Sequence, residues 1–366
     1  MTKKNIEIVL LKDNEIEELN NFYNSIHKVN RDKEKFVWEF VNAPAGKAIY
    51  VIAKDIDTQK IVGTQCAIPI EIINDKGNVV LTAKSEDTIV HPDYRGLNIF
   101  DNMYKLLFEK CRENGIKYLW GFTSAKKPFL KLGFEIPFIH TQSLMVFSII
   151  SAYKYLSKLN SKNSFLPLLK IFFLCFASKL ISLKRLLISE KSLDKNFSFS
   201  HYDKSTVKDN NQLFPKSTYN GFWIKQNLSF LTWRIANNPY HEKIFNIYFC
   251  LNSNVVANLI FNHHKNSVWY LINDTYSAEI SEEQRIAILN KSIKLLLAKE
   301  KNNVKLIRTW DFSHNDYGKN EIITRKKIGF IHLERGVSFV WKSLDESNTL
   351  NANDFILSRI ATQGVV

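Results

Sequence analysis

Cysteine is scarce in this sequence of 366 residues, and the four that occur are scattered. Cys66, Cys111, Cys175 and Cys250 have no paired spacing, and no cysteine and histidine cluster has the spacing of zinc ligands. Each lies in an apolar run, which is typical of a small buried residue. We therefore predict no metal site. The unpaired cysteines, and the lack of an apolar signal region behind residues 1–5, favour a reducing cytoplasm.

Acidic residues are also in short supply. Asp and Glu number 36 against 50 Lys and Arg, which gives a formal net charge of +14. A basic surface attracts anions such as coenzyme A, nucleotide-linked sugars, anionic lipid or nucleic acid. The lysines are spread along the chain and no nucleic-acid module is recognisable, so we predict no nucleic-acid partner. A solvated lysine-rich surface without a specific partner remains the simpler explanation.

The most informative stretch is residues 85–114. Residues 85–90 have the pattern of a strand, residues 91–98 form a turn and a short loop, and an amphipathic helix follows. The apolar face of that helix is spaced at i, i+4, i+7, i+8 and i+12, on Ile99, Met103, Leu106, Leu107 and Cys111. First-turn amides lack partners inside a helix and carry partial positive charge, so residues 95–100 are expected to bind a phosphorylated ligand.

These residues resemble the phosphate loop of the GNAT acetyltransferase superfamily, whose signature is Q/R-x-x-G-x-G/A after a strand. Arg95 matches the first position, whereas Asn98 replaces the internal glycine and Phe100 replaces the terminal Gly or Ala. Asn tolerates positive φ better than most residues and is a good N-cap, so the loop can keep its shape. Phe100 is expected to point into the core from the first helical turn.

The resemblance extends over roughly the first 145 residues. Strands are expected at 6–10, 48–53, 61–73 and 117–122, a helix at 14–26, and a hairpin turn at Gly77. Residues 124–134, which end in Leu-Gly-Phe, resemble the short helix that closes the GNAT core. The implied fold is α/β (α+β), with mixed sheets flanked by helices.

A second αβ pattern begins near residue 198, in a chain long enough for two domains. A helix is expected at 217–239, strands at 244–250, 255–261 and 267–273, a helix at 282–299, a strand at 305–310, a short helix at 317–326 and a last strand at 336–341. Ile328-Gly329-Phe330 echoes Leu132-Gly133-Phe134, which predicts tandem GNAT-like units with a degenerate second copy. The expected domains are 1–147, a basic apolar helical insertion at 148–197, a degenerate unit at 198–345 and a tail at 346–366.

The second copy lacks the phosphate loop. Residues 275–279 contain no glycine and have acidic neighbours, so a diphosphate would be repelled there and the cofactor is expected only in the first half. The remnant would shape a substrate cleft or a subunit contact.

The resemblance implies acyl transfer from acetyl-coenzyme A to a small-molecule amine, which needs a base for the amine proton, polarisation of the thioester and a proton for the thiolate. Glu86 and Asp87 are the candidate catalytic carboxylates; strand alternation would put them on opposite faces, and Glu86 is preferred because it would share a face with Thr88 and Val90. A structural carboxylate is the alternative. Many GNAT enzymes carry a tyrosine acid where this sequence has Phe129. The expected cofactor-binding residues are Ile89, Val90, Tyr94, Arg95, Gly96, Leu97, Asn98, Ile99 and Phe100.

Residues 151–188 contain no Asp or Glu, while lysines alternate with apolar residues. Pro167 suits the first turn of a helix over 168–188. The lysines interrupt the apolar run, which argues against a membrane span. Such a helix can lie in a membrane interface through 165–188, pack on another subunit as in a homodimer, or cover the companion domain, and covering the companion domain is favoured.

Three functions remain open. Leu231-Thr232-Trp233-Arg234 and the two-domain layout resemble GNAT proteins of surface-polysaccharide pathways, which implies N-acetylation of an amino sugar, nucleotide-linked or lipid-linked. An acyltransferase peripheral to the inner membrane face, acting on a membrane-linked or protein substrate, is the second. A non-catalytic GNAT-like binding module is the third, and Asn98, Phe100 and Phe129 are its evidence.

Overall fold

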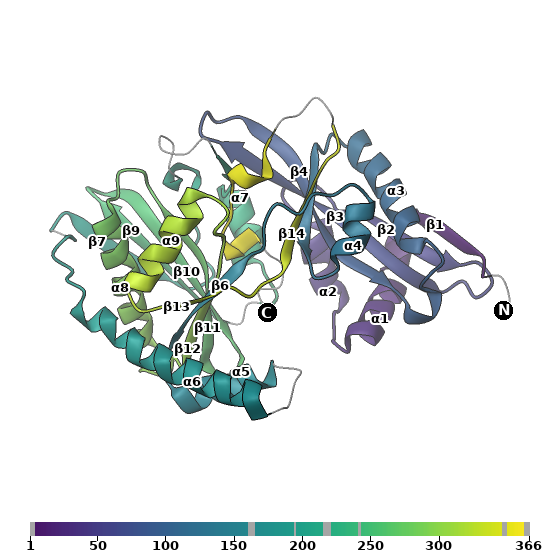
Figure 1. Cartoon of the computed structure of the whole chain (residues 1–366). Coiled ribbons are helices and arrows are strands. Elements are labelled where there is room, and N and C mark those ends of the chain that lie inside the picture. The colour runs from purple at the N-terminus through teal and green to yellow at the C-terminus, as the bar shows by residue number, and fades with distance from the viewer. Residues whose placement is uncertain are drawn as a thin grey trace. The chain divides into compact units, whose positions relative to one another are not determined.

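The computed structural model describes residues 4–159, 165–193, 195–214, 221–240, 243–345 and 350–361. The chain divides into two compact units, each built around a mixed β-sheet with helices on its faces (Figure 1), and the predicted fold class is confirmed. Unit 1 comprises Met1–Phe138, Asn237–Pro239 and Val337–Asn353. Unit 2 comprises Ile139–Ala236, Tyr240–Gly336 and Asp354–Val366.

The sheet of unit 1 has the strand order β1-β2-β3-β4-β5-β14. Its strands are β1 (Ile6–Leu10), β2 (Ile49–Asp55), β3 (Ile61–Asn74), β4 (Val79–Val90), β5 (Tyr118–Thr123) and β14 (Ser338–Ser343). β3 and β4 form the predicted long hairpin, with Gly77 at φ 83° in its turn. The β4 and β5 strands run parallel, and all other neighbours in this order are antiparallel.

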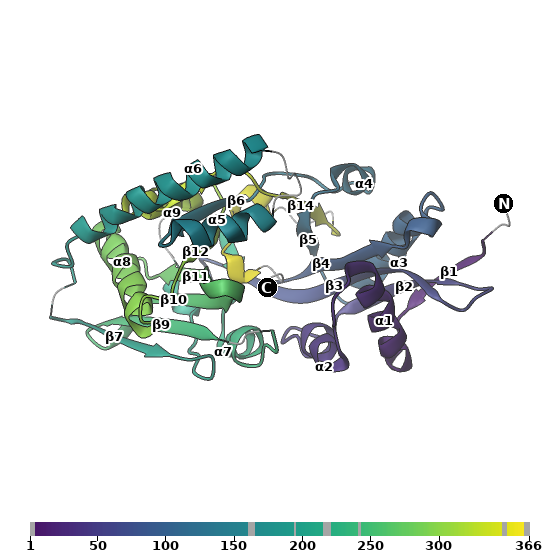
Figure 2. The same cartoon turned by 90° about the horizontal axis from the view of Figure 1, so that it is seen from below.

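Helices cover both faces of the unit 1 sheet (Figures 1 and 2). They are α1 (Ile16–His27), α2 (Lys33–Phe36), α3 (Ile99–Glu113) and α4 (Lys126–Lys131). The predicted apolar face of α3 packs into the core: Ile99, Met103, Leu107 and Cys111 are buried against Val51 and Ala53 of β2, Ala67 of β3 and Ala83 of β4. Because this packing seats α3 on the sheet, the N-terminus of α3 is held at the end of β4.

The sheet of unit 2 has the order β13-β6-β12-β11-β10-β9-β7. Its strands are β6 (Thr141–Val146), β7 (Phe197–Tyr202), β9 (Ile244–Leu251), β10 (Asn254–His264), β11 (Val268–Tyr276), β12 (Leu306–Asp311) and β13 (Ile331–Leu333). Its helices are α5 (Ile149–Lys158), α6 (Phe165–Ile181), α7 (Leu228–Leu231), α8 (Glu282–Lys299) and α9 (Asp316–Lys327). Strand alternation separates two cores, because Met145 packs with α8 whereas Leu144 and Val146 pack with α5 and α6.

The two units exchange a strand, and the predicted boundaries at 147 and 345 differ from the structure for this reason. β6 follows the elements of unit 1 in sequence but pairs with β12 and β13 of unit 2. β14, the predicted last strand of the second half, pairs with β5 of unit 1. The expected tail is also divided: residues 350–353 belong to unit 1, and the short strand β15 (Phe355–Ile356) pairs with β8 (Phe222–Ile224) in unit 2.

The helix predicted over residues 217–239 is wrong in its first half, apart from residues 217–220, which lie outside the described part of the chain. Three consecutive buried β-formers, Phe222, Trp223 and Ile224, form β8 instead. α7 then leads into a π-helical turn, Thr232–Ala236. The same construction occurs in unit 1, where α2 leads into the π-helical turn Val37–Val41.

This shared turn is an internal repeat. An N-cap side chain opens each helix, Asp32 accepting from the Lys35 amide at 2.9 Å and Asn227 accepting from the Phe230 amide at 2.8 Å. A tryptophan and a buried charged residue follow in each, Trp38-Glu39 and Trp233-Arg234, and Asn and Pro follow at matching distances. Arg234 donates from Nε to the Ile360 carbonyl at 3.0 Å. The Leu-Thr-Trp-Arg motif is therefore a packed structural element of unit 2.

The basic segment expected as an insertion belongs to unit 2 and covers one face of its sheet, the alternative that the sequence favoured. Ser178 Oγ accepts from the Val146 amide at 3.1 Å, and Ser182 Oγ donates to the Val146 carbonyl at 3.2 Å. The expectation that its lysines interrupt the apolar run too early is wrong: Phe165–Leu187 is long and apolar enough to cross a membrane by composition. Only 17% of an 18-residue apolar stretch within this segment is buried.

Candidate active site

A cleft of about 800 Å³ opens in unit 1 where β4 and β5 diverge. The two strands pair in parallel only from Thr82 to Lys84, opposite Tyr118 to Trp120. Beyond this point they separate, and the loop before α3 and the closing helix α4 complete the walls. The lining residues are Ser85, Glu86, Asp87, Thr88, Val90, Tyr94, Arg95, Gly96, Asn98, Ile99, Phe100, Asp101, Gly121, Phe122, Thr123, Ser124, Ala125, Lys127, Pro128, Phe129, Lys131 and Val340.

The loop before α3 has the backbone conformation that an anion site needs. Gly96 has φ 83°, and Asn98 occupies the N-cap position of α3 with φ 56°, so the prediction that Asn can take the positive φ of the internal glycine is confirmed. The Asn98 side chain makes no cap hydrogen bond, so the expected side-chain capping is wrong. The Tyr94 hydroxyl donates to Asp55 Oδ2 at 2.6 Å and fixes the start of the loop. The open first-turn amides of α3 and the exposed Arg95 then border the cleft together.

Most of the predicted cofactor residues line this cleft. Val90, Tyr94, Arg95, Gly96, Asn98, Ile99 and Phe100 are among the lining residues. Ile89 and Leu97 are not: Ile89 is buried in the sheet, and the Leu97 side chain is 43% exposed. Their main-chain groups belong to the same strand and loop, so they contribute to the shape of the site through its backbone.

Aromatic rings form the inner wall. Phe100 lies 4.8 Å from Tyr104 and 5.6 Å from Phe129, measured between ring centroids, so Phe100 packs toward the core as expected. Phe129 is buried and also contacts Phe134. Phe129 thus brings an apolar ring to the cleft at the position where the resemblance implied a tyrosine hydroxyl.

A bulge in β4 changes which side chains face which way. Asp87 has φ 52°, and the β3 to β4 register shifts at this point. Ser85 Oγ and Thr88 Oγ1 both lie near the Tyr104 hydroxyl of α3, at 2.8 Å and 3.4 Å, although they are three residues apart. The expectations that Glu86 shares a face with Thr88, and that Glu86 and Asp87 point to opposite faces, are therefore wrong.

Both carboxylates instead leave the sheet on the face away from α3. Glu86 forms an ion pair with Lys84, a buried lysine two residues earlier on the strand. Asp87 forms an ion pair with Arg31 and accepts from the Tyr50 hydroxyl at 2.7 Å. Asp87 is held on two sides and only 9% of its side chain is exposed, whereas 28% of the Glu86 side chain is.

Tyr50 and Tyr104 act as neutral hydroxyl groups. Burial, together with the Asp87 carboxylate, raises the pKa of Tyr50 well above its usual value. Burial also raises the pKa of Tyr104, although hydrogen bonds to Ser85 and Thr88 oppose the rise. Ser85, Thr88 and Tyr104 therefore form a protonated hydroxyl cluster at the wall of the cleft.

Sequence reasoning missed the contribution of α4. Lys127 and Lys131 line the cleft, and Lys131 forms an ion pair with Asp101 of the first turn of α3. The Ser-Ala-Lys-Lys-Pro sequence that starts α4 was the available signal, because its lysines follow directly after a strand whose parallel neighbour carries the phosphate loop. Gly121 was also missed; a Cβ there would lie 3.0 Å from the Ser85 carbonyl oxygen.

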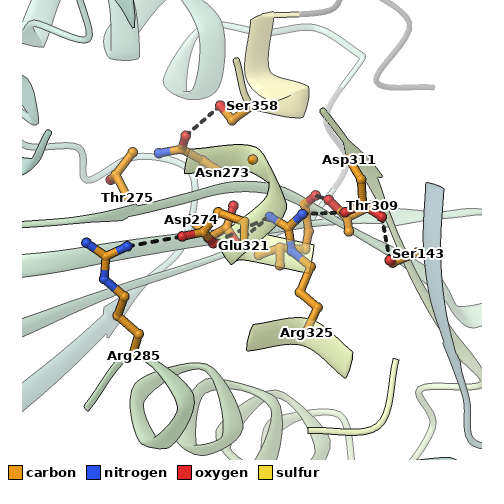
Figure 3. A network of polar contacts seen from close by, with 12 residues as sticks. Ser143, Asn273, Asp274, Thr275, Arg285, Thr309, Asp311, Glu321, Arg325 and Ser358 are labelled. Atoms are coloured by element: carbon orange, nitrogen blue, oxygen red, sulfur yellow. Dashed lines mark hydrogen bonds and ion pairs between the residues drawn. The ribbon is translucent and has the colours of Figure 1, made fainter. Parts of the chain in front are cut away.

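Unit 2 has no comparable cleft among its described residues at the corresponding place. β11 and β12 pair in parallel from Val268 to Tyr270 and then diverge, as β4 and β5 do. The space holds the network of Figure 3, in which the Arg325 guanidinium of α9 lies between Asp274 of β11 and Asp311 of β12. Arg325 Nη2 is 2.6 Å from Asp274 Oδ2, and Arg285 Nη1 donates to Glu321 Oε1 at 3.3 Å.

The acidic members of this network differ in their proton affinity. Burial raises the pKa of Glu321 to about 7, and the Asp274 carboxylate adds to the rise. Burial also raises the pKa of Asp274 above its usual value. Although burial alone would raise the pKa of Asp311, Arg325 and hydrogen bonds from His332 and Ser143 hold that pKa below its ordinary value. The cavity beside this network holds only about 20 Å³.

Residues 7–136 match the family described as acetyltransferase (GNAT) domain. No curated protein matches the chain. Among solved structures, a tandem GNAT protein from the clavulanic acid biosynthesis pathway is 12% identical, with a TM-score of 0.55 over 94% of this chain and 100% of that one. A GCN5-related N-acetyltransferase from Anabaena variabilis is 9% identical, with a TM-score of 0.60 over 93% of this chain and 73% of that one.

A glucosamine N-acetyltransferase region of a fungal multi-domain β-N-acetylglucosaminidase is also similar in structure. It is 12% identical, with a TM-score of 0.55, and the match covers 93% of this chain and 38% of that one. At these low sequence identities, the likeness shows a shared fold and no more. The fold of the whole chain is thus similar to that of a tandem GNAT protein, and the GNAT domain match falls on the unit that has the cleft.

Proposed function

We propose that this chain transfers an acetyl group from acetyl-coenzyme A to the nitrogen of a small amine, in the cleft of unit 1. The observation that carries the proposal is the division of charge along the cleft wall. Cations come from the loop and α4, as Arg95, Lys127 and Lys131, and the Asp101 carboxylate beside them is paired with Lys131. The carboxylates Glu86 and Asp87 come from the β4 bulge. A cationic amine and an anionic diphosphate are each attracted to a different part of the wall.

The residues present fit coenzyme A. The loop amides, the N-terminus of α3 and Arg95 can hold a diphosphate, and about 800 Å³ of space leads inward between β4 and β5. Acetyl-coenzyme A supplies the activated acetyl group when bound. Of the two expected main-chain donors at the end of β4, Ile89 and Val90, the Val90 amide is the one that can face the cleft and hold a carbonyl oxygen. Successive strand amides alternate in direction, and the neighbouring His91 amide bonds the Val62 carbonyl of β3.

Glu86 is the proposed base that accepts the amine proton. It lines the cleft and is more exposed than Asp87, which Arg31 and Tyr50 already hold. Lys84 beside Glu86 keeps the carboxylate in place. On the opposite wall, the Ser85 and Thr88 hydroxyls, with the buried Tyr104 hydroxyl behind them, hold exchangeable protons in the region where Phe129 offers none.

The proposed acceptor is an amino sugar, nucleotide-linked or lipid-linked, in surface-polysaccharide biosynthesis. The Leu-Thr-Trp-Arg resemblance and the glucosamine N-acetyltransferase neighbour support this choice. The test is thiol release from acetyl-coenzyme A against a panel of amino sugars and their nucleotide derivatives, with product mass increased by one acetyl group. If thiol is released with an unrelated amine but with none of the amino sugars, the amino-sugar acceptor is wrong and the acetyl-transfer reaction still holds.

A non-catalytic binding module is the competing function, since Phe100 and Phe129 place two rings where related enzymes have a small residue and a tyrosine. Calorimetry with coenzyme A separates the possibilities. Binding with no thiol release against any amine would favour the binding module, and no binding by folded protein would contradict both.

A further inference from the structure

The helix α6 carries an exposed apolar stripe on the side that faces away from its own unit. The stripe is formed by Phe165, Phe172, Phe173, Phe176 and Leu180 of α6 and by Leu183 of the turn that follows, with exposed fractions between 42% and 76%. Their spacing of seven, one, three, four and three residues follows the helical repeat of 3.6, so they share one face. An apolar face this continuous is unusual on a protein surface unless something covers it.

The opposite face of α6 is firmly built into unit 2. Cys175 is fully buried with Val146, Leu306 and Tyr155, and Ile171 and Leu174 pack against the same cluster. The Ser178 and Ser182 hydroxyls bond the main chain of Val146, which lies beyond the last β13 pair, Ile331 with Leu144. A close approach of Gly329, whose added Cβ would lie 2.6 Å from the Ile181 carbonyl oxygen, fixes the end of the helix.

Cations flank the apolar stripe. At 3.6 residues per turn, Lys170 and Lys179 fall on opposite edges of the stripe, and Lys184 follows in the 3₁₀ turn Ser182–Leu187. The sequence from residue 151 to residue 188 contains no Asp or Glu at all. The surface that α6 presents is thus apolar in its centre and positive at its edges.

We propose that α6 docks unit 2 on an anionic lipid bilayer, lying in the plane of the interface with the Phe and Leu side chains inserted and the lysines at the headgroups. Burial of the apolar side chains and attraction of the lysines to anionic lipid both contribute to the binding of such a helix at the interface. The lysine side chains are long enough to reach the headgroups from the edges of an inserted stripe. This proposal is independent of the acetyl-transfer chemistry.

The charge distribution favours a bilayer over a second copy of the chain. A two-fold contact would bring this face against the same face of its partner. Lys170, Lys179 and Lys184 would then approach the same three lysines without an acidic residue from this segment to compensate them. Phosphate and carboxylate headgroups supply the missing negative charge.

The packing also favours lying on the bilayer over crossing it. A spanning helix would have to leave its contacts with β6, because the serine bonds to Val146 and the buried Cys175 face require the sheet beside it. Strand main chain and the charged groups of unit 2 cannot enter the hydrocarbon core without partners. An interfacial position keeps every one of these contacts.

Sedimentation of the full chain with vesicles tests the proposal. Vesicles of phosphatidylcholine with 30% phosphatidylserine are compared with pure phosphatidylcholine, at 0.05 M and 0.5 M salt. We expect binding to the anionic vesicles that weakens steeply with salt, because a tenfold rise in ionic strength shortens the Debye length about threefold. Changing Lys170, Lys179 and Lys184 together to Glu is expected to weaken binding about 100-fold or more, from about fivefold per lysine.

Two further variants give the test its controls. Lys265→Glu with Lys301→Glu and Lys326→Glu changes the net charge equally at exposed positions of unit 2 outside residues 151–188, and is expected to leave most of the binding. Phe172→Ser with Phe173→Ser and Phe176→Ser removes three exposed rings, of which Phe172 also contacts the Tyr153 ring of α5. This variant, once shown to be folded, is expected to weaken binding at least tenfold.

Four results would overturn the proposal. One is the absence of sedimentation of folded protein with anionic vesicles at low salt. Another is an equal loss of binding in the two lysine variants, which would make the attraction a general charge effect. The third is a stable dimer that the three Phe→Ser changes convert to a monomer, which would give the stripe to a second copy. Protein that resists alkaline extraction from vesicles would likewise contradict an interfacial position.

Discussion

The two units of this chain share a pair of diverging parallel strands, but the space between the strands is open in unit 1 and filled by side chains in unit 2. In each, two parallel strands pair over three residues and then diverge, β4 from β5 and β11 from β12. In unit 1 the divergence leaves a cleft of about 800 Å³. In unit 2 it holds Arg325 between Asp274 and Asp311, with about 20 Å³ of space beside them (Figure 3).

The closing helix makes the difference. α4 has six residues and brings Phe129 and two lysines to the wall, whereas α9 has twelve and brings Glu321 and Arg325 into the gap. Diverging strands create a place for a ligand, and the helix that follows decides whether side chains fill it first. Because Arg325 compensates Asp274 and Asp311 in the gap of unit 2, no external ion is needed to balance their charge.

The largest expected effect comes from breaking the filled gap. Arg325→Met leaves Asp274 and Asp311 buried without their shared cation, which is expected to cost roughly 3–5 kcal/mol of unfolding free energy. Hydrogen exchange should show lost protection in α9 and β11. Lys319→Met, an exposed position on the same helix whose ion pair with Asp316 is solvated, should change stability by less than about 0.5 kcal/mol. Equal stability of both variants would show that the network does not hold unit 2.

A second change tests the open gap. Arg95→Glu puts a carboxylate beside the expected diphosphate and is predicted to lower coenzyme A affinity by about 100-fold or more, since a cation is lost and a repulsion gained. Calorimetry measures the affinity. Lys105→Glu makes the same charge change on an exposed position of α3 and should have little effect. Unchanged affinity in folded Arg95→Glu protein would remove the cofactor from this loop.

The third prediction separates the two carboxylates of the β4 bulge. Glu86→Gln is expected to lower the turnover of acetyl transfer by about 100-fold while coenzyme A binding stays intact, the scale for one acid-base group. Asp87→Asn should act mainly on stability, because it weakens the Arg31 ion pair. A turnover loss confined to Asp87→Asn, measured at equal folded fraction, would transfer the role to Asp87.

The smallest effect is a pH dependence of unit 2. The pKa of Glu321 is about 7 in the folded chain and near 4.5 when unfolded. Between these values the folded state binds more protons than the unfolded state, so this group lowers stability as pH rises from about 4.5 to 7. Glu321→Gln should flatten that decline by about 1 kcal/mol or more, seen as a smaller difference between melting temperatures at pH 5 and pH 7.5. An identical pH profile would contradict it.

Local patterns predicted local structure well. The bounds of β1 and α8 agree with the sequence, since period-two alternation defines the first, and Ser281 with Gln284 forms a capping box at the second. The phosphate loop also took its expected backbone, because positive φ at Gly96 and Asn98 depends on the residues themselves. Seven of the nine expected cofactor positions line the cleft, because they belong to this locally determined strand end, loop and helix start.

Features that depend on distant partners escaped prediction. Nothing in the Ser-Glu-Asp-Thr sequence marks the bulge at Asp87, which arises from the register with β3 and from Arg31 and Tyr50 on other elements. Likewise, β6 and β14 are each short strands whose sequences do not specify which sheet they join. Element order along the chain then suggested contiguous domains where the structure has an exchange.

That exchange constrains how the chain is made. A ribosome releases residues in order, so the sheet around the cleft must wait without its edge strand until residues 338–343 emerge, long after residue 123 of β5. A nascent chain that stops at residue 147 presents an open edge on β5 and an unpaired β6, the kind of surface on which chains aggregate. Completion of the cleft is therefore expected to be one of the last events of synthesis, and a truncated product that ends near residue 147 is expected to precipitate.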